Sequence, residues 1–200
     1  MPKNTFYNLP EEKKEKIIAA AKEEFTIFPL YKARVSNIIS KAGIPRGSFY
    51  QYFVDLEDLY FYVIDKYLDN IYSVGAEYIS KTTDLIEFAN LTFDYDYDAF
   101  SNDSRHKFMG NVLRSISDNE EYIKKFNDKR TTYIKMIFDE MDTTKIRFQN
   151  EEEFYKIYHL IQSVKRMIVQ KSMFDKLSKE EALKEFKWHL NIIENGIMVK

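Results

Sequence analysis

The sequence predicts an all-α protein of about nine helices. Apolar residues recur at spacings of three and four along most of the chain, which is the periodicity of a helix with one buried face. Only five of the 200 residues are glycine, and none of the four prolines follows Pro45. The chain beyond that proline therefore has few residues that interrupt helices, and long helices are expected there.

The first helix is expected over residues 10 to 28. Pro10 suits a helix start, and the acidic Glu11 and Glu12 favour its positive end. Two short helices are expected within residues 34 to 53, and a fourth runs from Asp55, a favourable N-cap, to about residue 79. The remaining helices are expected at residues 84 to 100, 104 to 113, 119 to 141, 151 to 172 and 178 to 198. Residues 142 to 150 are expected to form a loop, and Ser178 with Glu181 is a capping box for the last helix.

The segment RVSNIISKAGIPRGSFYQYF, residues 34 to 53, has the layout of a helix-turn-helix. Gly43 gives the backbone freedom that a tight turn between two helices requires. Pro45 follows at the point where the second helix would begin. That helix combines small, basic and hydroxyl side chains with Phe49 and Phe53, which are predicted to pack. A helix of this kind is typical of one that enters the DNA major groove.

Composition and charge narrow the class further. The chain has no cysteine, which excludes disulfides and thiolate metal sites. Neither a membrane span nor a signal peptide is apparent, so we expect a cytoplasmic, nucleoid-associated protein. Residues 1 to 53 carry nine Lys and Arg against five Asp and Glu, whereas the rest carries 21 against 27. A basic N-terminal part on an acidic remainder suits a DNA-binding module joined to a second module.

The segment from Glu12 to about Tyr67 resembles the N-terminal domain of TetR-family transcriptional regulators. The resemblance lies in IIAAAKEEF, in IISKAGIPRGSFYQYF and in DLEDLYFYVIDKY, in this order. It implies a three-helix DNA-binding domain at residues 1 to 54 and a larger helical effector-binding and dimerisation domain at residues 55 to 200. Two places depart from the family pattern: Pro29-Leu30-Tyr31 replaces a glycine followed by an aromatic residue, and Leu56 replaces a phosphate-contacting lysine.

The expected DNA contacts lie at the starts of the two short helices and along the second one. Arginine can pair with a phosphate or bind guanine bidentately, and hydroxyl groups can donate to phosphate oxygens. Glutamine can recognise adenine, and a glycine lets the backbone approach closely. Either tyrosine ring could instead pack. The predicted DNA-binding residues are Arg34, Ser36, Arg46, Gly47, Ser48, Tyr50, Gln51 and Tyr52.

The second domain is rich in aromatic residues, as expected for an apolar effector pocket. By the resemblance, the helices after residue 55 enclose that pocket, although each ring could equally belong to the core. The predicted lining residues are Tyr62, Phe88, Phe93, Tyr97, Phe108, Phe126 and Tyr133. The carboxylates Asp94, Asp96 and Asp98 could bind a cation or simply face water. The expected effector is therefore a small hydrophobic or cationic compound.

The last two helices carry apolar stripes at helical spacing, and in this family such helices form a four-helix dimer interface. A homodimer also suits DNA half-sites about one helical turn apart. The predicted interface residues are Phe154, Ile157, Tyr158, Ile161, Phe186, Leu190, Ile193 and Ile197. Further apolar residues lie off these stripes: Leu160, Met167, Val169, Trp188 and Ile192.

These features predict a homodimeric repressor that binds a palindromic operator and is released by a small-molecule effector. His106, His159 and His189 lack the spacing of metal ligands, and no motif suggests catalysis, so neither a metal, a cofactor nor an enzymatic activity is expected. One alternative is a DNA-binding regulator or activator that is controlled by a protein partner. Another is a helical interaction or enzyme module in which the N-terminal pair is only a packing hairpin. The exposure of Arg46, Tyr50 and Gln51 distinguishes that last alternative.

Overall fold

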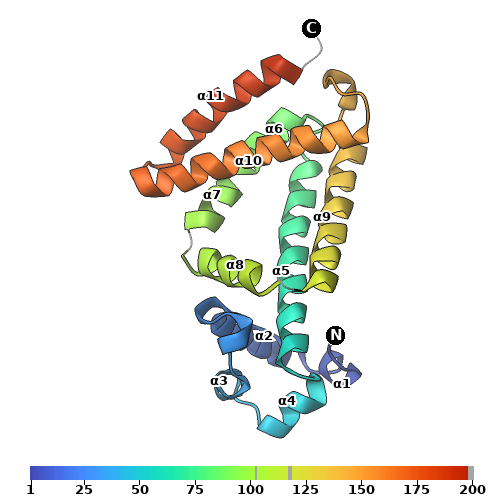
Figure 1. The fold of residues 1–200 in the computed structure, drawn as a ribbon, viewed down its shortest axis with the longest axis vertical. Helices are drawn as coiled ribbons and strands as arrows, with labels where there is room; N and C mark the ends of the chain where they lie inside the picture. The colour runs from blue at the N-terminus through green and yellow to red at the C-terminus, as the bar shows by residue number, and fades with distance from the viewer. Residues whose placement is uncertain (102, 117–118, 198–200) are drawn as a thin grey trace. The chain divides into compact units, whose positions relative to one another are not determined.

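The computed structural model describes residues 1–101, 103–116 and 119–197, and helices make up most of these residues (Figure 1). The predicted all-α class is confirmed. The α-helices are α1 (Asn4–Tyr7), α2 (Glu11–Ile27), α3 (Val35–Ala42), α4 (Arg46–Tyr52), α5 (Leu56–Ile79), α6 (Leu85–Leu91), α7 (Phe93–Ser101), α8 (Asp103–Ile116), α9 (Glu120–Glu140), α10 (Glu151–Asp175) and α11 (Lys179–Ile197). Two 3₁₀ helices are η1 (Leu30–Lys32) and η2 (Thr143–Lys145).

The structure adds three short elements to the prediction. Helix α1 precedes the first expected helix, and η1 and η2 occupy segments expected to be loops. The single helix predicted at residues 84 to 100 is in fact two, because it is interrupted at Thr92. There the hydroxyl of Thr92 bonds back to the carbonyl oxygens of Phe88 at 2.8 Å and Ala89 at 3.3 Å. Such local side-chain bonding competes with regular helix and favours an end.

The predicted helix caps are confirmed at two places. The amide of Asp58 donates to Asp55 at 2.8 Å, and the amide of Val54 donates to Asp58 at 3.1 Å, which defines the start of α5. At α11, the Ser178 amide donates to Glu181 at 2.8 Å, and the Glu181 amide donates to the Ser178 hydroxyl at 3.3 Å. Both arrangements satisfy amides that a helix N-terminus leaves without partners.

The chain divides into two compact units. Unit 1 comprises Met1–Ile71 and Asp103–Lys124, and unit 2 comprises Tyr72–Asn102 and Lys125–Lys200. By packing, residues 55 to 71 and α8 thus belong with the N-terminal helices, beyond the predicted boundary at residue 54. The functional division at that residue is a separate matter and stays a prediction.

In unit 1, α2 packs against α3 and α8, and α1 packs against α4. The amide of Asn111, in α8, donates to the carbonyl oxygens of Phe25 and Thr26, each at 3.0 Å. The carbonyl of the same asparagine accepts from the Tyr60 hydroxyl at 3.4 Å, while the Tyr60 ring contacts the Phe25 ring edge-on. Asn111 therefore joins α2, α5 and α8 around the scaffold on which α3 and α4 rest.

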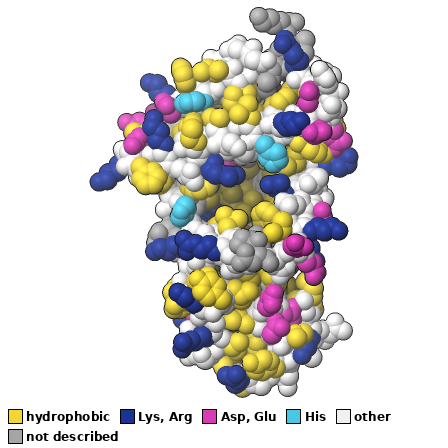
Figure 2. Space-filling model, in the orientation of Figure 1, with side chains coloured by type: hydrophobic (Ala, Val, Ile, Leu, Met, Phe, Trp, Pro, Cys, Tyr) yellow, Lys and Arg dark blue, Asp and Glu magenta, His cyan; other side chains and the backbone are white. Residues whose placement is uncertain are grey.

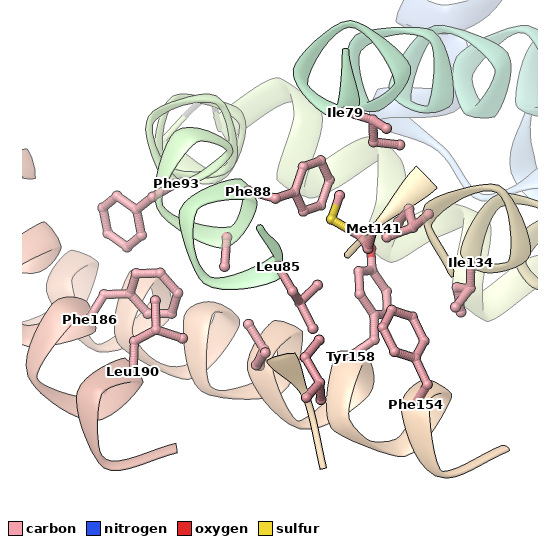
Figure 3. Close-up of a cluster of buried hydrophobic side chains, with 14 of the residues drawn as sticks. Ile79, Leu85, Phe88, Phe93, Ile134, Met141, Phe154, Tyr158, Phe186 and Leu190 are labelled. Carbon is pink, nitrogen blue, oxygen red and sulfur yellow. The ribbon is translucent and has the colours of Figure 1, made fainter. Parts of the chain in front are cut away.

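In unit 2, α10 packs against α7 and α11, and α11 also packs against α6. Figure 3 shows the apolar core that these helices enclose, with Phe93, Phe186 and Leu190 at one end and Phe88 nearer the middle. Phe154 and Tyr158 of α10 face Ile134 and Met141 in the same cluster. Among the described helices, none has a stretch long and apolar enough to cross a membrane.

Candidate nucleic-acid interface

The turn between α3 and α4 depends on Gly43. This residue caps α3 with φ of +65°, in the left-handed region that side chains with a Cβ rarely adopt. The amide of Ile44 then donates to the Ile39 carbonyl at 3.1 Å, which closes the helix end. Pro45 follows as the residue before the first turn of α4. The predicted glycine turn is confirmed.

Helix α4 has one buried and one exposed face. Phe49 and Phe53 are fully buried, with ring centroids 5.4 Å apart, and they hold the helix on unit 1. The opposite face carries Arg46, Tyr50 and Gln51, all exposed to solvent. Burial of these three side chains would have contradicted a DNA-binding role. Their exposure meets that requirement and leaves them available to a large external ligand.

Arg46 and Tyr50 lie one helical turn apart and act as a pair. The guanidinium carbon of Arg46 lies 5.8 Å from the centre of the Tyr50 ring, within the range of a cation–π contact. Its Nη2 is also 3.5 Å from the tyrosine hydroxyl, at the limit of a hydrogen bond. Both polar groups lie on the exposed face of α4, where phosphates or base edges could be contacted.

Gly47 lies on the exposed face beside this pair, and Ser48 is half-buried. A Cβ added to Gly47 would meet no atom of the protein within 4 Å. The glycine is therefore not required by packing within the chain, although it weakens a helix relative to alanine. Close approach of an external backbone would explain its presence.

Tyr52 is the one buried residue of the predicted set. Its side chain is only 6% exposed and packs against the rings of Phe6 and Phe53, with the Lys13 ammonium 5.8 Å from the ring centre. The Tyr52 ring is therefore part of the core of unit 1. A phosphate contact through its hydroxyl stays a prediction, as does the contact of the more exposed Tyr50.

The N-terminal end of α3 carries the other two predicted contacts, Arg34 and Ser36, both exposed. Beside it lies a surface groove of about 570 Å³, lined by Phe28, Tyr31, Lys32, Ala33, Arg34 and Asn37. The lining contains two basic side chains and no acidic one, which suits an anionic partner such as a phosphate backbone. Leu56, at the start of α5, where a lysine was expected from the family pattern, is half-buried.

A buried carboxylate orders this end of α3. Glu24 of α2 is 1% exposed, and its Oε1 accepts hydrogen bonds from the Arg34 amide at 2.9 Å and from Asn37 Nδ2 at 3.0 Å. The Arg34 amide is thus already satisfied, so a phosphate at this position would be bound by the side chains of Lys32, Arg34 and Ser36. Sequence reasoning did not identify Glu24, because it follows other acidic residues on a charged helix.

Lys3 and Thr5, at the start of α1, hold the C-terminal end of α4 by donating hydrogen bonds to its backbone carbonyl groups. The amide of Lys3 donates to the Tyr52 carbonyl and its ammonium to the Tyr50 carbonyl, both at 2.8 Å. The Thr5 hydroxyl donates to the Gln51 carbonyl. These bonds satisfy carbonyl groups that a helix C-terminus leaves without partners. In the sequence, Lys3 and Phe6 precede Pro10 and the first expected helix, and they give little indication of an additional helix that contacts α4.

The predicted effector-pocket residues are distributed over both units. In unit 1, Tyr62 packs against Phe6, and Phe108 packs against Tyr67. In unit 2, Phe88 and Phe93 belong to the buried core, and Tyr97 donates to the Leu177 carbonyl at 2.9 Å. Phe126 is half-buried, and Tyr133 stacks on Tyr72. The structure brings Phe93 and Tyr97 together, but a pocket lined by the whole set stays a prediction.

The predicted dimer residues are largely core residues of their own subunit. Phe154, Ile161 and Phe186 are fully covered, Leu190 is 1% exposed and Tyr158 is 7% exposed. A side chain already buried in unit 2 has no surface left to bury against a second copy, so these five are corrected to core. Ile157 and Ile193 are half-buried, and the side chain of Ile197 lies outside the described residues.

Large apolar residues of α10 and α11 that lie off the stripes are instead exposed: Leu160 at 50%, Met167 at 48%, Trp188 at 62% and Ile192 at 56%. Met173 at 37% and Phe174 at 87%, near the end of α10, are exposed as well. Figure 2 shows hydrophobic side chains gathered over α10 and α11 on the visible face of unit 2, between lysines, arginines and histidines. Val169, which also lies off the stripe, is fully buried.

Two family models match the chain. Residues 80–197 match the model described as tetracyclin repressor-like, C-terminal domain, and residues 17–63 match that of bacterial regulatory proteins, tetR family. A search of curated protein sequences gave no match. Within the described residues, no group of three or more His, Asp or Glu side chains could hold a metal ion.

Solved structures of low sequence identity share the fold. A TetR-family transcriptional regulator from Streptomyces coelicolor has a TM-score of 0.72 at 10% identity, over 96% of this chain and 93% of that one. The transcriptional regulator FadR from Bacillus subtilis, solved in complex with stearoyl-CoA, has a TM-score of 0.65 at 18% identity, over 92% and 98%. A TetR family regulator from Chloroflexus aurantiacus has a TM-score of 0.53 at 19% identity, over the full length of both chains. Because the C-terminal-domain model matches residues 80–197, more than half of the sequence, the chain belongs to the TetR family of bacterial transcriptional regulators.

Proposed function

We propose that the protein is a homodimeric repressor that binds a palindromic operator through α3 and α4 and is released by a small-molecule effector. The observation that carries the DNA-binding part is the exposed face of α4. Arg46, Gly47, Tyr50 and Gln51 share that face, while Phe49 anchors the helix from behind. This combination of groups supports both phosphate contacts and recognition of base edges.

The groove beside the α3 N-terminus supports a second set of phosphate contacts. Lys32 and Arg34 line it, and the exposed Ser36 follows in the first turn of α3. A helix N-terminus also favours a negative charge through its dipole. In this proposal α3 is fixed on a phosphate while α4 enters the major groove.

A dimer supplies the second recognition helix that a palindrome requires. We assign its interface to Leu160 and Met167 of α10 with Trp188 and Ile192 of α11. Leu160 and Met167 are seven residues apart, and Trp188 and Ile192 are four apart, so each pair occupies one face of its helix. Four large apolar side chains at 48% to 62% exposure are a surface that association would cover.

The effector part of the proposal rests on the family and on one relative. The structure of the Bacillus subtilis regulator FadR, which has the same fold, contains stearoyl-CoA. An effector that binds the operator-free form more tightly than the DNA-bound form would shift the population toward release. We place the corresponding site in unit 2.

The decisive experiment is selection of operator DNA from randomised duplexes at several salt concentrations. We expect enrichment of a palindrome with half-sites about ten base pairs apart, and a steep loss of affinity with salt. Arg46→Ala and Tyr50→Phe should lose this enrichment. Arg147→Ala, an exposed arginine of unit 2, and Tyr7→Phe, whose tyrosine is 44% exposed like Tyr50 at 42%, are the matched controls.

Two results would contradict the proposal. One is failure to enrich any sequence even at low salt, where phosphate contacts are strongest. The other is equal loss of enrichment in the two control variants, which would show that the exposed face of α4 has no special role. A reporter gene placed behind the selected operator then tests the sign of regulation, because a repressor lowers its expression and an activator raises it.

A further inference from the structure

Unit 2 contains a buried lysine on the inner face of α10. Lys165 is 2% exposed, and its Nζ lies 2.5 Å from Asp96 Oδ2 and 2.8 Å from the Thr92 hydroxyl oxygen. The Thr92 hydroxyl donates its own proton to the Phe88 carbonyl, so it can only accept from the lysine. Thr92 lies between α6 and α7, and Asp96 lies in the first turn of α7. Lys165 thus ties α10 to the junction between these helices.

The position of this lysine is costly for the fold. It stands four residues after Ile161 and three before Ile168, both in the core, where the helical pattern calls for an apolar side chain. Lysine is almost never fully buried unless it is paired. Burial lowers the pKa of Lys165, and the neighbouring Asp96 acts in the opposite direction. A methionine would fill the same volume without that cost, which indicates that the charge has a use.

Two of the three ammonium donors are accounted for. An ammonium group has three donors and no acceptor. Asp96 and Thr92 accept from two of them, and among the residues that the structure describes no acceptor is found for the third. Asp96 is also the less buried partner, since its side chain is 32% exposed against 3% for Lys165. The lysine is therefore left with donor capacity that its own protein does not use.

A small cavity lies against this lysine. It has a volume of about 100 Å³ and is lined by Asp96, Phe100, Gln162, Lys165, Arg166 and Val169. One water occupies about 30 Å³ in the liquid, so the space suits a carboxylate or phosphoryl group but not a whole drug-sized ligand, which needs about 300 Å³ or more. The lining therefore matches the head of a larger molecule.

The charges around the cavity favour an anion. Lys165 and Arg166 contribute two positive charges against the single carboxylate of Asp96. Arg166 is exposed and, within the described part of the chain, forms no ion pair. Gln162 adds an amide donor, and Phe100 and Val169 add apolar walls. Guanidinium and ammonium groups in such proximity are the usual ligands of carboxylate and phosphate oxygens.

We propose that this cavity is an anion-binding subsite in which Lys165, Arg166 and Gln162 hold the carboxylate or phosphoryl head group of an amphiphilic effector. The anion binding is inferred from the cavity and its lining residues, whereas a role of this binding in regulation rests on the proposed function. This assignment replaces the expected cationic effector. Of the three carboxylates that suggested a cation, Asp96 is paired with Lys165 and Asp98 with Lys179, at 2.5 Å and 2.7 Å.

Binding of an anion at this subsite would change the conformation of unit 2. An anion that takes the place of Asp96 on Lys165 releases the carboxylate that fastens α7 to α10. Asp96 can leave because it already reaches solvent, while Lys165 cannot. Thr92 would keep its bond to the lysine and hold α6 in place. The expected response is a displacement of α7 with α6 and α10 unchanged.

The test measures heats of binding and thermal unfolding of the full chain with sodium octanoate, inorganic phosphate, 1-octanol and octylamine. Octanoate is expected to bind the unaltered protein, and Lys165→Met should weaken it by about tenfold or more, which is the worth of one charge-assisted hydrogen bond. Asp96→Asn should bind more tightly, because it removes the competing carboxylate. Octanoate should therefore raise the Tm of Asp96→Asn by more than that of the unaltered protein.

The control variant is Lys156→Met, which removes an exposed lysine from the same helix. It should bind octanoate like the unaltered protein. Octanol and octylamine, which carry the same chain without an anion, should not distinguish Lys165→Met from the unaltered protein. Binding of phosphate without octanoate, lost in Lys165→Met, would support the subsite and assign it to phosphoryl groups.

Equal affinity of the unaltered protein and Lys165→Met for both anions would overturn the subsite, as would an unaltered Tm of Asp96→Asn in their presence. Operator binding is measured separately on the same samples. Anion binding that depends on Lys165 but leaves operator affinity unchanged would uphold the subsite and contradict its regulatory role. Absence of operator binding under all conditions would contradict the proposed function alone.

Discussion

Asn37 donates its side-chain amide to both carboxylate oxygens of the buried Glu24, at 3.0 and 3.1 Å. The same carboxylate accepts from the Arg34 amide, so one residue of α2 fixes the start of α3 in two ways. These bonds fix the backbone at Arg34, one of the two basic residues that line the groove.

Glu24→Ala should reduce the free energy of unfolding by about 1 to 3 kcal/mol, since it leaves the Arg34 amide and the Asn37 side chain without their partner. Operator affinity should fall with it. Urea unfolding followed by circular dichroism measures the loss. The neighbouring Glu23→Ala removes only a surface ion pair with Lys41 and should change stability by no more than about 0.5 kcal/mol. Equal losses in the two variants would refute the assigned role of Glu24.

Gly47→Ala should separate folding from DNA binding. The added Cβ meets no protein atom within 4 Å, and alanine is favoured over glycine in a helix by about 1 kcal/mol. We expect a protein of equal or greater stability with weaker operator binding. Gly43→Ala is the contrasting variant, because φ of +65° there makes the substitution destabilising. Undiminished operator affinity in Gly47→Ala would show that DNA does not approach α4 at this residue.

Trp188→Glu should convert the proposed dimer into a monomer. It places a charge in the centre of the assigned interface, while the side chain, at 62% exposure, contributes little to the core of its own subunit. Sedimentation equilibrium gives the mass, and circular dichroism confirms the fold. Lys184→Glu, an exposed position of the same helix, should remain dimeric. A dimer that survives Trp188→Glu would place the interface elsewhere.

His159 should make the protein less stable in mild acid. Partial desolvation first, and then the nearby charges of Arg130 and Arg166, lower the pKa of this solvent-exposed histidine from its ordinary value of 6.5. The unfolded chain then takes up a proton at a higher pH than the folded one, so stability falls as the pH drops below about 6.5. His159→Gln should show a smaller fall between pH 7.5 and 5 in urea unfolding, with His189→Gln as the control. Parallel pH curves for the unaltered protein and His159→Gln would exclude this contribution.

The fold and much of the interface were predictable because local signals governed them. Gly43, Asp55 and Ser178 act within a few residues of themselves, so their turn and caps could be inferred from sequence and are present. The two faces of α4 also follow from its short helical pattern. Exposure of Arg46 and burial of Phe49 needed no knowledge of distant contacts.

The remaining features depend on contacts between residues far apart in the sequence. Tyr52 is buried because Phe6 of α1 packs against its ring, and no residue close to Tyr52 in the sequence indicates that helix. The apolar stripes of α10 and α11 were assigned to a dimer, yet they fill the core of unit 2. A stripe shows that a face is buried but not by which chain. Lys165 was not singled out in the sequence, because its partner Asp96 is distant along the chain and only the structure brings the two together.

The bonds from Lys3 and Thr5 to α4 go to carbonyl oxygens, not to side chains. Carbonyl groups are the same whichever amino acid stands at positions 50 and 51. The exposed residues of the recognition helix can therefore be exchanged without loss of the contacts that hold its end. Relatives of this chain could acquire new operator sequences by substitutions on that face alone, and a designer could alter its specificity there while the anchoring of the helix stays intact.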